Sequence, residues 1–207
     1  MTLLYQNDLE FYKANGVFTG IDEAGRGALA GPVVVAAVVL NYETMIEGIN
    51  DSKLLTPKKR AQLYPLIVEN ALDYSIVEIN PAYIDENNIL QATLLGFKTA
   101  FFQLASKPQY CLIDGKDIHA DLKHCAQVVI KGDQLFASIA AASILAKVHR
   151  DNLMLAYDDL YPEYGFASHK GYGTAYHAKM IHRFGLSPIH RKSFKIPEVR
   201  DQEVKKL

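Results

Sequence analysis

This chain is organised around nine residues, Thr19-Gly20-Ile21-Asp22-Glu23-Ala24-Gly25-Arg26-Gly27. Residues 17–21 predict a short strand, two adjacent carboxylates stand at its end, and an arginine between two glycines follows. Two carboxylates about 4 Å apart repel each other by about 4 kcal/mol at an effective dielectric constant near 20. Because a divalent cation would offset that repulsion, the stretch predicts a metal site.

The rest of the chain alternates strands with helices. Residues 33–40 form a continuous, mostly β-branched run, which predicts a strand buried on both faces. Further strands are expected at 72–79, 110–113 and 126–130, and helices at 57–70, 88–106, 134–160 and 175–185. Two consecutive strands followed by alternating helices and strands indicate an α/β fold with a mixed sheet.

Three of the predicted strands end at an aspartate: Asp22, Asp114 and Asp133. One aspartate there would be an ordinary turn residue, but three favour a site, because ligands of α/β sheets gather at strand ends. Adjacent strand residues point to opposite faces, so we expect Glu23 to be the first loop residue and to curl back towards Asp22. Oxygen ligands suit Mg²⁺ or Mn²⁺, and two such ions can drive hydrolysis of a phosphodiester.

The composition is that of a globular protein. The chain has 207 residues, of which 49% are apolar and 22% charged, and no apolar run approaches membrane-spanning length. This length fits one large domain, or one domain with a small appendage. We identify no signal peptide, and Cys111 and Cys125 form no CxxC pair, so we expect buried thiols in a soluble cytoplasmic protein.

The net charge of −1 conceals an asymmetry. No acid lies between Tyr164 and Pro197, a window that carries +6 and leaves −7 for the rest. The basic residues are Lys170, Lys179, Arg183, Arg191, Lys192 and Lys195, with His169, His177, His182 and His190 among them. We interpret this window as a basic surface for a polyanionic partner, the alternative being a solvated basic tail.

Other motifs fit less well. There is no GxxxxGK[ST] phosphate loop and no GxSxG elbow, and residues 25–31 match a dinucleotide fingerprint only loosely, because a strand follows them. Ser143 and Lys147 lie four residues apart on an alanine-rich predicted helix, and we interpret them as a packing residue and a solvent-reaching residue. Neither Ser143 with Lys147 nor the loop of residues 25–31 is as strong a candidate for a functional site as the carboxylates.

Six motifs, in order, resemble the motif set of bacterial ribonuclease HII from about Thr19 to Phe194. They are Asp22-Glu23-Ala24-Gly25-Arg26-Gly27, Asp51-Ser52-Lys53, Leu112-Ile113-Asp114-Gly115, Lys131-Gly132-Asp133, the stretch from Ala140 to Asp151, and His169-Lys170-Gly171-Tyr172-Gly173-Thr174. The resemblance implies a ribonuclease H-like mixed β-sheet flanked by helices in residues 1–160. It also implies a basic helical extension, residues 161–207, that contacts the substrate.

The implied activity is cleavage of RNA in RNA–DNA hybrids, and cleavage 5′ of single ribonucleotides embedded in duplex DNA. The products would carry 3′-hydroxyl and 5′-phosphate ends. By resemblance, the acids that hold two Mg²⁺ or Mn²⁺ ions are Asp22, Glu23, Asp114 and Asp133. The substrate-binding residues implied in the same way are Gly25, Arg26 and Gly27 at the ribonucleotide 2′-hydroxyl, Lys53 at a phosphate and Tyr172 stacked at the RNA–DNA junction.

Some roles stay open at this point. Asp151 is either a fifth acid near the site or a capping or pairing residue, and His169 either transfers a proton or adds to the basic surface. We expect a monomer with no membrane partner. Two other function classes remain to be separated by experiment: a phosphotransferase with strand-end aspartates, for which 207 residues are too few, and a hybrid-binding module without activity.

Overall fold

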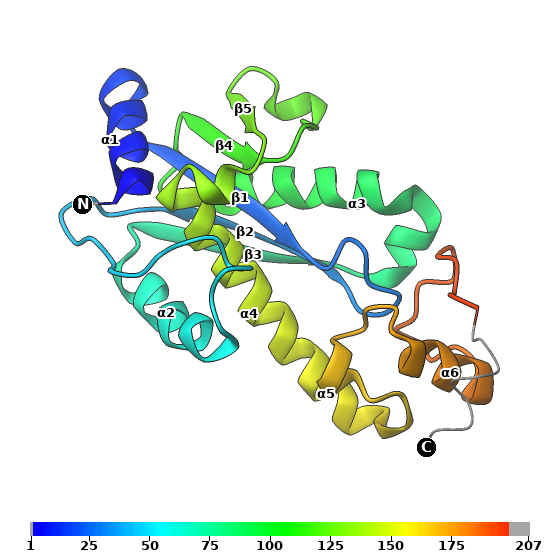
Figure 1. Ribbon diagram of the computed structural model, residues 1–207. Helices are drawn as coiled ribbons and strands as arrows, with labels where there is room; N and C mark the ends of the chain where they lie inside the picture. Colours follow the sequence, from blue (N-terminus) through cyan, green and yellow to red (C-terminus); the bar gives the residue numbers. More distant parts are fainter. Residues whose placement is uncertain (1, 199–207) are drawn as a thin grey trace.

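The computed structural model describes residues 2–198 as a five-stranded sheet with helices on both faces (Figure 1). The strands are β1 (Phe18–Ala24), β2 (Val33–Val39), β3 (Asp73–Ile79), β4 (Tyr110–Asp114) and β5 (Ala126–Val129). The helices are α1 (Leu3–Asn15), α2 (Pro57–Asn70), α3 (Pro81–Gln103), α4 (Ala137–Leu160), α5 (Phe166–His169) and α6 (Ala175–Phe184).

The sheet has mixed strand directions and the order β3-β2-β1-β4-β5. β2 pairs antiparallel with both β1 and β3, whereas β1, β4 and β5 run parallel to one another. The expected mixed α/β fold is therefore confirmed. Because three parallel neighbours deliver their carboxyl ends to one edge, the residues that close β1, β4 and β5 come together there.

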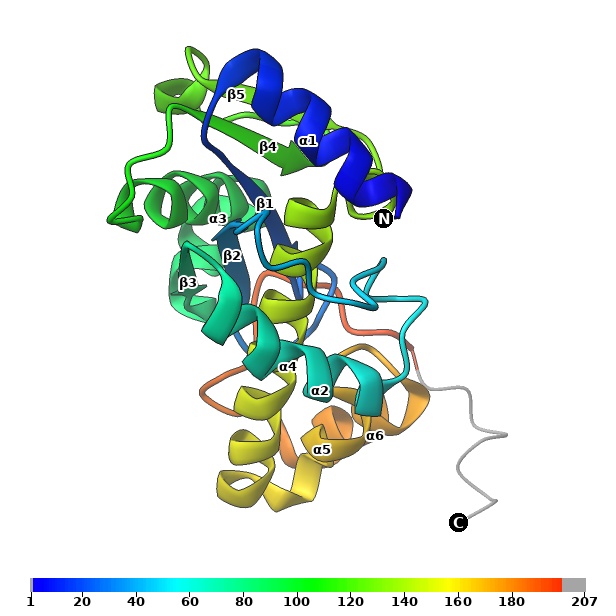
Figure 2. The same cartoon turned by 90° about the vertical axis from the view of Figure 1, so that its left-hand side faces the viewer.

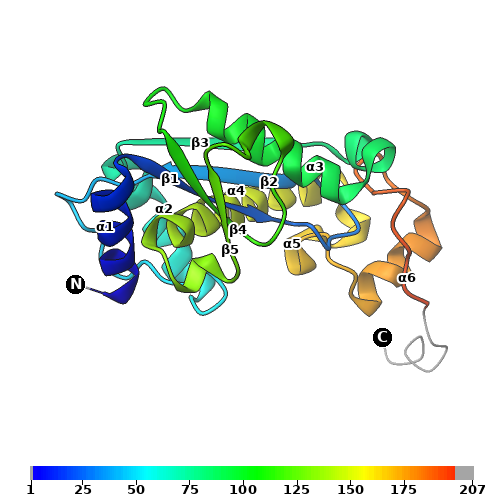
Figure 3. The ribbon, with the colours of Figure 1, turned by 90° about the horizontal axis from the view of Figure 1, so that it is seen from above.

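Every residue of β2 is buried, as its apolar run predicts. Val34, Ala36 and Val38 face the core under α4 and α2, while Val33 and its alternate neighbours face the core under α3. Figures 2 and 3 show the resulting layers, with α3 on one side of the sheet and α4 with α2 on the other. Each fully buried valine contributes about 1.5–3 kcal/mol by leaving water, so this strand anchors both cores.

Helix α4 lies unusually close to β1. Ala140, Ala141 and Ala142 are fully buried, and a Cβ at Gly20 would lie only 2.3 Å from the Ile139 nitrogen. Small residues on both elements thus allow the close approach that the alanine run predicts. The packing fixes α4 beside the strand that carries Asp22.

Two helices begin at other positions than expected. α3 begins at Pro81, after Asn80 caps it, and Asn88 interrupts it with a φ of 66° while its side chain accepts from the N–H groups two and three residues later. Asparagine tolerates left-handed backbone and caps helices well, so Asn88 begins the second segment of α3 and not the helix itself. α4 begins at Ala137 because Gly132–Gln134 form a 3₁₀ turn.

Helix α1 lies outside the motif-bearing region and supports α4. The buried Asp8 carboxylate accepts from the Ser138 N–H at 2.9 Å and from the Ser138 hydroxyl at 3.2 Å. It provides the cap that Phe136, the residue before α4, cannot supply. Asn7 also donates to the Leu135 carbonyl at 2.7 Å. The N-terminal helix thereby fixes the segment between Asp133 and α4.

The C-terminal elements form a core of their own against the end of α4, in which Met154 packs with Phe166 and Ile181. The division into residues 1–160 and 161–207 stays a prediction, and residues 199–207 lie outside the described part. Cys111 and Cys125 are buried free thiols, as expected. Within residues 2–198, no helix combines the length and apolar character needed to span a membrane.

Candidate active site

Asp22, Asp114 and Asp133 meet at one edge of the sheet. One carboxylate oxygen of each lies within 4.8 Å of the others. Asp22 belongs to β1, Asp114 ends β4, and Asp133 lies in the 3₁₀ turn after β5. The Gly132 N–H donates to the Asp114 carboxylate at 2.7 Å, which ties that turn to β4. The convergence expected from the strand ends is confirmed.

The cluster is short of compensating positive charge. Burial raises the pKa of Asp22 well above its usual range, and the neighbouring Glu23 and Asp114 raise it further. Burial also raises the pKa of Asp133, although the Lys53 ammonium, 3.1 Å away, opposes that rise. A cluster of carboxylates that repel one another, with so little positive charge nearby, is suited to binding a cation.

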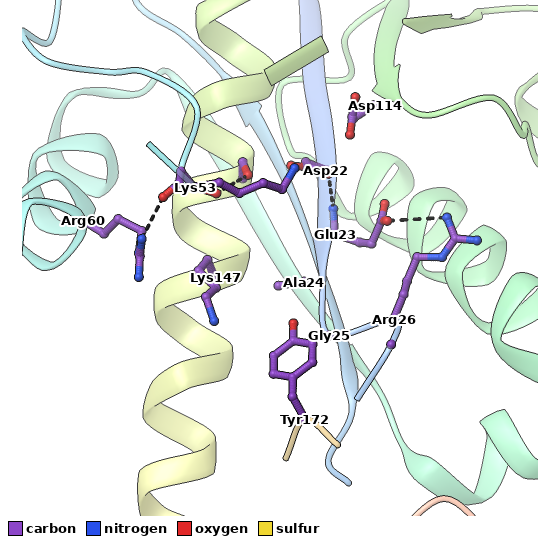
Figure 4. Close-up of a pocket in the computed structure, with 13 residues that line it drawn as sticks. Asp22, Glu23, Ala24, Gly25, Arg26, Lys53, Arg60, Asp114, Lys147 and Tyr172 are labelled. Atoms are coloured by element: carbon purple, nitrogen blue, oxygen red, sulfur yellow. Dashed lines mark hydrogen bonds and ion pairs between the residues drawn. The ribbon is translucent and has the colours of Figure 1, made fainter. Parts of the chain in front are cut away.

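Glu23 differs from its expected placement. β1 continues through Ala24, and Glu23 pairs with Val35, so it is a strand residue and not the first loop residue. Its side chain faces Arg26 at 3.5 Å (Figure 4), and it is not one of the three residues whose oxygens cluster. Burial raises the pKa of Glu23 to about 7. Among the described residues, its buried Oε2 has no hydrogen-bond partner.

These observations fit a divalent metal ion. Three clustered carboxylates and the unpartnered, buried Glu23 oxygen beside them offer the hard oxygen ligands that Mg²⁺ and Mn²⁺ prefer. Among residues 2–198, Lys53 is the one cation that pairs with any of the three clustered aspartates, and its side chain is 74% exposed, so it can move away when an ion enters.

The loop after β1 is held from behind by Arg191. Its guanidinium donates to the carbonyls of Gly25 and Arg26, at 2.8 Å each. Gly25 has a φ of 93°, and a Cβ there would lie 2.0 Å from the Arg150 side chain. At Gly27, by contrast, a Cβ would meet only open space. The loop is thus fixed on its protein side and open at Gly27.

A cavity of about 300 Å³ connects the acids with Tyr172 (Figure 4). Every predicted site residue except Asp133 lines it: Asp22, Glu23, Gly25, Arg26, Gly27, Lys53, Asp114 and Tyr172. Tyr172 is 36% exposed. Its ring centroid lies 5.6 Å from the Lys147 ammonium and 5.2 Å from the Arg150 guanidinium. Apart from Asp133, the predicted site residues therefore share one concave surface.

Five further residues line this cavity: Ala24, Ser52, Arg60, Ser143 and Lys147. Ser143 is buried and Lys147 is partly exposed, as interpreted from the sequence, and both also face this cavity. Arg60 donates to the Ser52 and Leu55 carbonyls, at 2.7 Å each, and so holds the loop of Lys53. The sequence signal for Arg60 was its position in the first turn of a helix, where positive charge opposes the helix dipole.

The contacts of Asp151 and His169 bear on the two roles that the sequence left open. Asp151 pairs with Lys147 at 2.7 Å, which makes it a pairing residue. His169 is largely buried, with its Nε2 2.9 Å from the Tyr164 carbonyl, so it does not contribute to a basic surface.

The predicted basic surface is smaller than expected. His177, His190 and Arg191 are also buried, because they hydrogen-bond within the C-terminal region and to the loop after β1. The exposed cations of the window are Arg183, Lys192 and Lys195, with Lys170 and Lys179 half-buried.

The sequence is similar to those of known proteins. A family model described as Ribonuclease HII matches residues 19–196. A Coxiella burnetii (strain Dugway 5J108-111) protein named Ribonuclease HII is 52% identical over 181 residues, covering 87% of this chain and 89% of the relative. A protein of the same name from Clostridioides difficile (strain 630) is 54% identical over 175 residues, covering 84% of this chain and 68% of the relative.

Solved structures agree with the fold. The ribonuclease H2 from Pyrococcus horikoshii OT3 has a TM-score of 0.73 at 29% identity and covers 86% of this chain and 94% of its own. Bst-RNase HIII in complex with Mn²⁺ has a TM-score of 0.65 at 18% identity, covering 86% and 67%. That second likeness concerns the fold alone.

The fold is shared with these structures, and its mixed sheet carries carboxylates that converge at the ends of neighbouring parallel strands; together these features define a hydrolase of the ribonuclease H type. Within that class, the chain belongs to the ribonuclease HII family. Membership implies endonuclease activity on the RNA of RNA–DNA hybrids and a requirement for divalent metal ions.

Proposed function

We propose that this protein cuts the RNA strand of RNA–DNA hybrids, and duplex DNA on the 5′ side of a single embedded ribonucleotide, by two-metal-ion hydrolysis. The products carry 3′-hydroxyl and 5′-phosphate ends. The observation that carries the proposal is the convergence of Asp22, Asp114 and Asp133, the first two of which line a cavity that also contains Tyr172. The protein acts as a monomer in the cytoplasm.

The residues that would hold Mg²⁺ or Mn²⁺ in this proposal are Asp22, Glu23, Asp114 and Asp133. When bound, such ions supply Lewis-acid activation of the attacking water and stabilisation of the leaving oxygen. The Glu23 N–H donates to Asp22 at 2.7 Å and fixes the carboxylate for this role. The Ser143 hydroxyl next to Asp22 adds a second restraint.

The chain's own cations position the phosphate. Lys53 carries an exposed ammonium group next to Asp133, from which it can move to a phosphate oxygen. Lys147 and Arg60 line the same cavity and add positive charge on the side of α4 and α2. A phosphodiester entering here would be held by these cations on one side, while metal ions held by the acids would offset the repulsion from the carboxylates on the other.

Selection of the ribonucleotide falls to the loop of Gly25, Arg26 and Gly27. Backbone without side chains allows close approach to a 2′-hydroxyl, the group that separates RNA from DNA. The open space at Gly27 supports this role, because the protein itself does not require a glycine there. Tyr172, at the other end of the cavity, stacks on the nucleotide at the RNA–DNA junction.

The C-terminal extension, residues 161–207, follows the duplex backbone. Arg183, Lys192 and Lys195 supply its exposed charge, and binding of this kind is independent of sequence and sensitive to salt. This charge alone would also suit a binding module without activity. In that case the buried acid cluster would only destabilise the protein.

The test uses a DNA duplex with one ribonucleotide and a matched all-DNA duplex, each incubated with the protein with and without Mg²⁺ or Mn²⁺. We expect metal-dependent cutting of the first duplex only, directly 5′ of the ribonucleotide. Cutting without metal, or equal cutting of both duplexes, would contradict the proposal. Asp22→Asn should bind the hybrid in low-metal buffer without cutting it, whereas a binding module would show no cutting even in the wild type.

A further inference from the structure

Three histidines form a buried cluster directly behind Tyr172. His177 is fully buried, His190 is 1% exposed and His169 is 9% exposed. The rings of His169 and His177 stack with centroids 4.3 Å apart. None of them lines the cavity described above. Their role is therefore not explained by direct contact with substrate.

The hydrogen-bond partners assign one proton arrangement to His177 and His190. The Ser187 N–H can only donate, and it points at His190 Nδ1 at 2.9 Å, so this nitrogen carries no proton. The proton of a neutral His190 ring is then on Nε2, which lies 3.0 Å from His177 Nε2 and donates to it. The proton of His177 is consequently on Nδ1, which donates to the Tyr172 carbonyl at 3.0 Å.

The chain of bonds has one direction, from the Ser187 backbone through two neutral rings to the Tyr172 backbone. A second proton on either ring would place two donors face to face. Burial lowers the pKa of both His177 and His190 to about 4, in agreement with neutral rings. His169 completes the support, since its Nδ1 accepts from the Gly171 N–H at 3.2 Å.

The segment that these rings hold has an unusual backbone. Lys170 and Gly171 have positive φ values of 52° and 80°. A Cβ at Gly171 would lie 2.5 Å from the Ala30 carbonyl oxygen, and Tyr172 forms an isolated antiparallel bridge with Ala28. The Tyr172 loop therefore presses against the segment between the Gly25–Gly27 loop and β2. A small shift of the tyrosine main chain would move its ring relative to that loop.

We propose that His177 and His190 are positioning residues that hold the Tyr172 main chain in place. They thereby fix the position of the Tyr172 ring relative to the Gly25–Gly27 loop, so that the ring can stack at the RNA–DNA junction while the loop contacts the ribonucleotide. The inference rests on the proposed function, in which Tyr172 and this loop select the ribonucleotide. Neither histidine touches the substrate; both act through the Tyr172 carbonyl.

Two substitutions at position 177 separate this role from general packing. In His177→Gln the amide can face His190, at the place of Nε2, but nothing remains at the place of Nδ1. In His177→Asn the amide nitrogen takes the place of Nδ1 and can donate to Tyr172. His182 is an exposed histidine on the same helix, so His182→Gln and His182→Asn are matched controls.

The readout is the ratio of kcat/KM on a duplex with one ribonucleotide to kcat/KM on a uniform RNA–DNA hybrid. We expect His177→Gln to lower this ratio by about tenfold, as for one lost buried hydrogen bond, and His177→Asn to restore most of it. The His182 controls should keep the wild-type ratio. Equal losses on both substrates, or a wild-type ratio in His177→Gln, would overturn the inference.

A spectroscopic measurement on the wild type decides the case if the variants fail to fold. Histidine ¹⁵N correlation spectra at neutral pH should show the proton of His177 on Nδ1 and that of His190 on Nε2. A His177 proton on Nε2, or a doubly protonated ring, would overturn the inference. A wild type that does not cut at a single ribonucleotide would instead refute the proposed function, so the two failures are distinguishable.

Discussion

Asp22→Asn is expected to stabilise the metal-free protein while it abolishes cutting. The Asp22 side chain is 4% exposed, and one of its oxygens lies within 4.8 Å of oxygens of Asp114 and Asp133. Two full charges at that distance repel by about 3.5 kcal/mol at an effective dielectric constant near 20. Because burial and nearby acids already raise the pKa of Asp22, protonation relieves part of this repulsion, and we expect a gain of about 1–2 kcal/mol in unfolding free energy.

A gain of this size raises the melting temperature by about 2–8 °C for a chain of this length. In excess Mg²⁺ the order should reverse, because the wild type gains about 2.7 kcal/mol at a metal concentration of about 100 times Kd, while the variant has lost a central ligand. The assay is thermal unfolding by circular dichroism at pH 8, in EDTA and in Mg²⁺.

The control is Asp159→Asn, which removes an exposed acid from the far end of α4. It should change the unfolding free energy by no more than about 0.5 kcal/mol in either buffer. A metal-free Asp22→Asn protein that melts below the wild type would refute the reasoning from charge repulsion. So would a wild type whose melting temperature does not respond to Mg²⁺.

Three further predictions follow from buried groups and close contacts. Burial raises the pKa of Glu23 and of Asp8 to about 7, so each of these carboxyls stabilises the folded state at low pH and loses that contribution as pH rises to about 7, whereas His177 and His190, with pKa values lowered to about 4, act in the opposite direction. The metal-free stability of the wild type in urea should therefore fall relative to that of Glu23→Gln as pH rises from about 4 to 7, and a constant difference between the two would contradict this. Tyr172→Ala should lower cleavage at a single ribonucleotide by about 10–100-fold, with a much smaller loss of duplex affinity; equal losses would indicate a structural tyrosine. Gly20→Ala should cost about 1–3 kcal/mol in urea unfolding, because its Cβ would meet the Ile139 nitrogen at 2.3 Å; unchanged stability would show that α4 can shift.

The parts of the fold that the sequence predicts are those decided locally. The run of valines in β2 predicts a strand buried on both faces, and Thr56 with Pro57 marks the start of α2, where the Thr56 side chain does accept from the Lys59 N–H. Asp22 and Asp114 were placed together because strand ends share a sheet edge, which depends only on topology.

The parts that the sequence did not predict depend on distant contacts. Asp8 caps α4 across 130 residues, a pairing that no local pattern indicates. Glu23 was expected in a loop because adjacent strand residues point to opposite faces and it had to curl back towards Asp22, but pairing with Val35 extends the strand. The C-terminal histidines were interpreted as surface charge, whereas burial and mutual hydrogen bonds keep His177 and His190 neutral.

The central claim is that acids from separate strands hold divalent ions in one cavity. Anomalous scattering from crystals of the protein grown with Mn²⁺ and an uncleavable hybrid tests it most directly. The account predicts manganese peaks between the carboxylates of Asp22, Asp114 and Asp133, on the side of Glu23 Oε2. Manganese bound elsewhere, with the aspartates facing only water or Lys53, would contradict it.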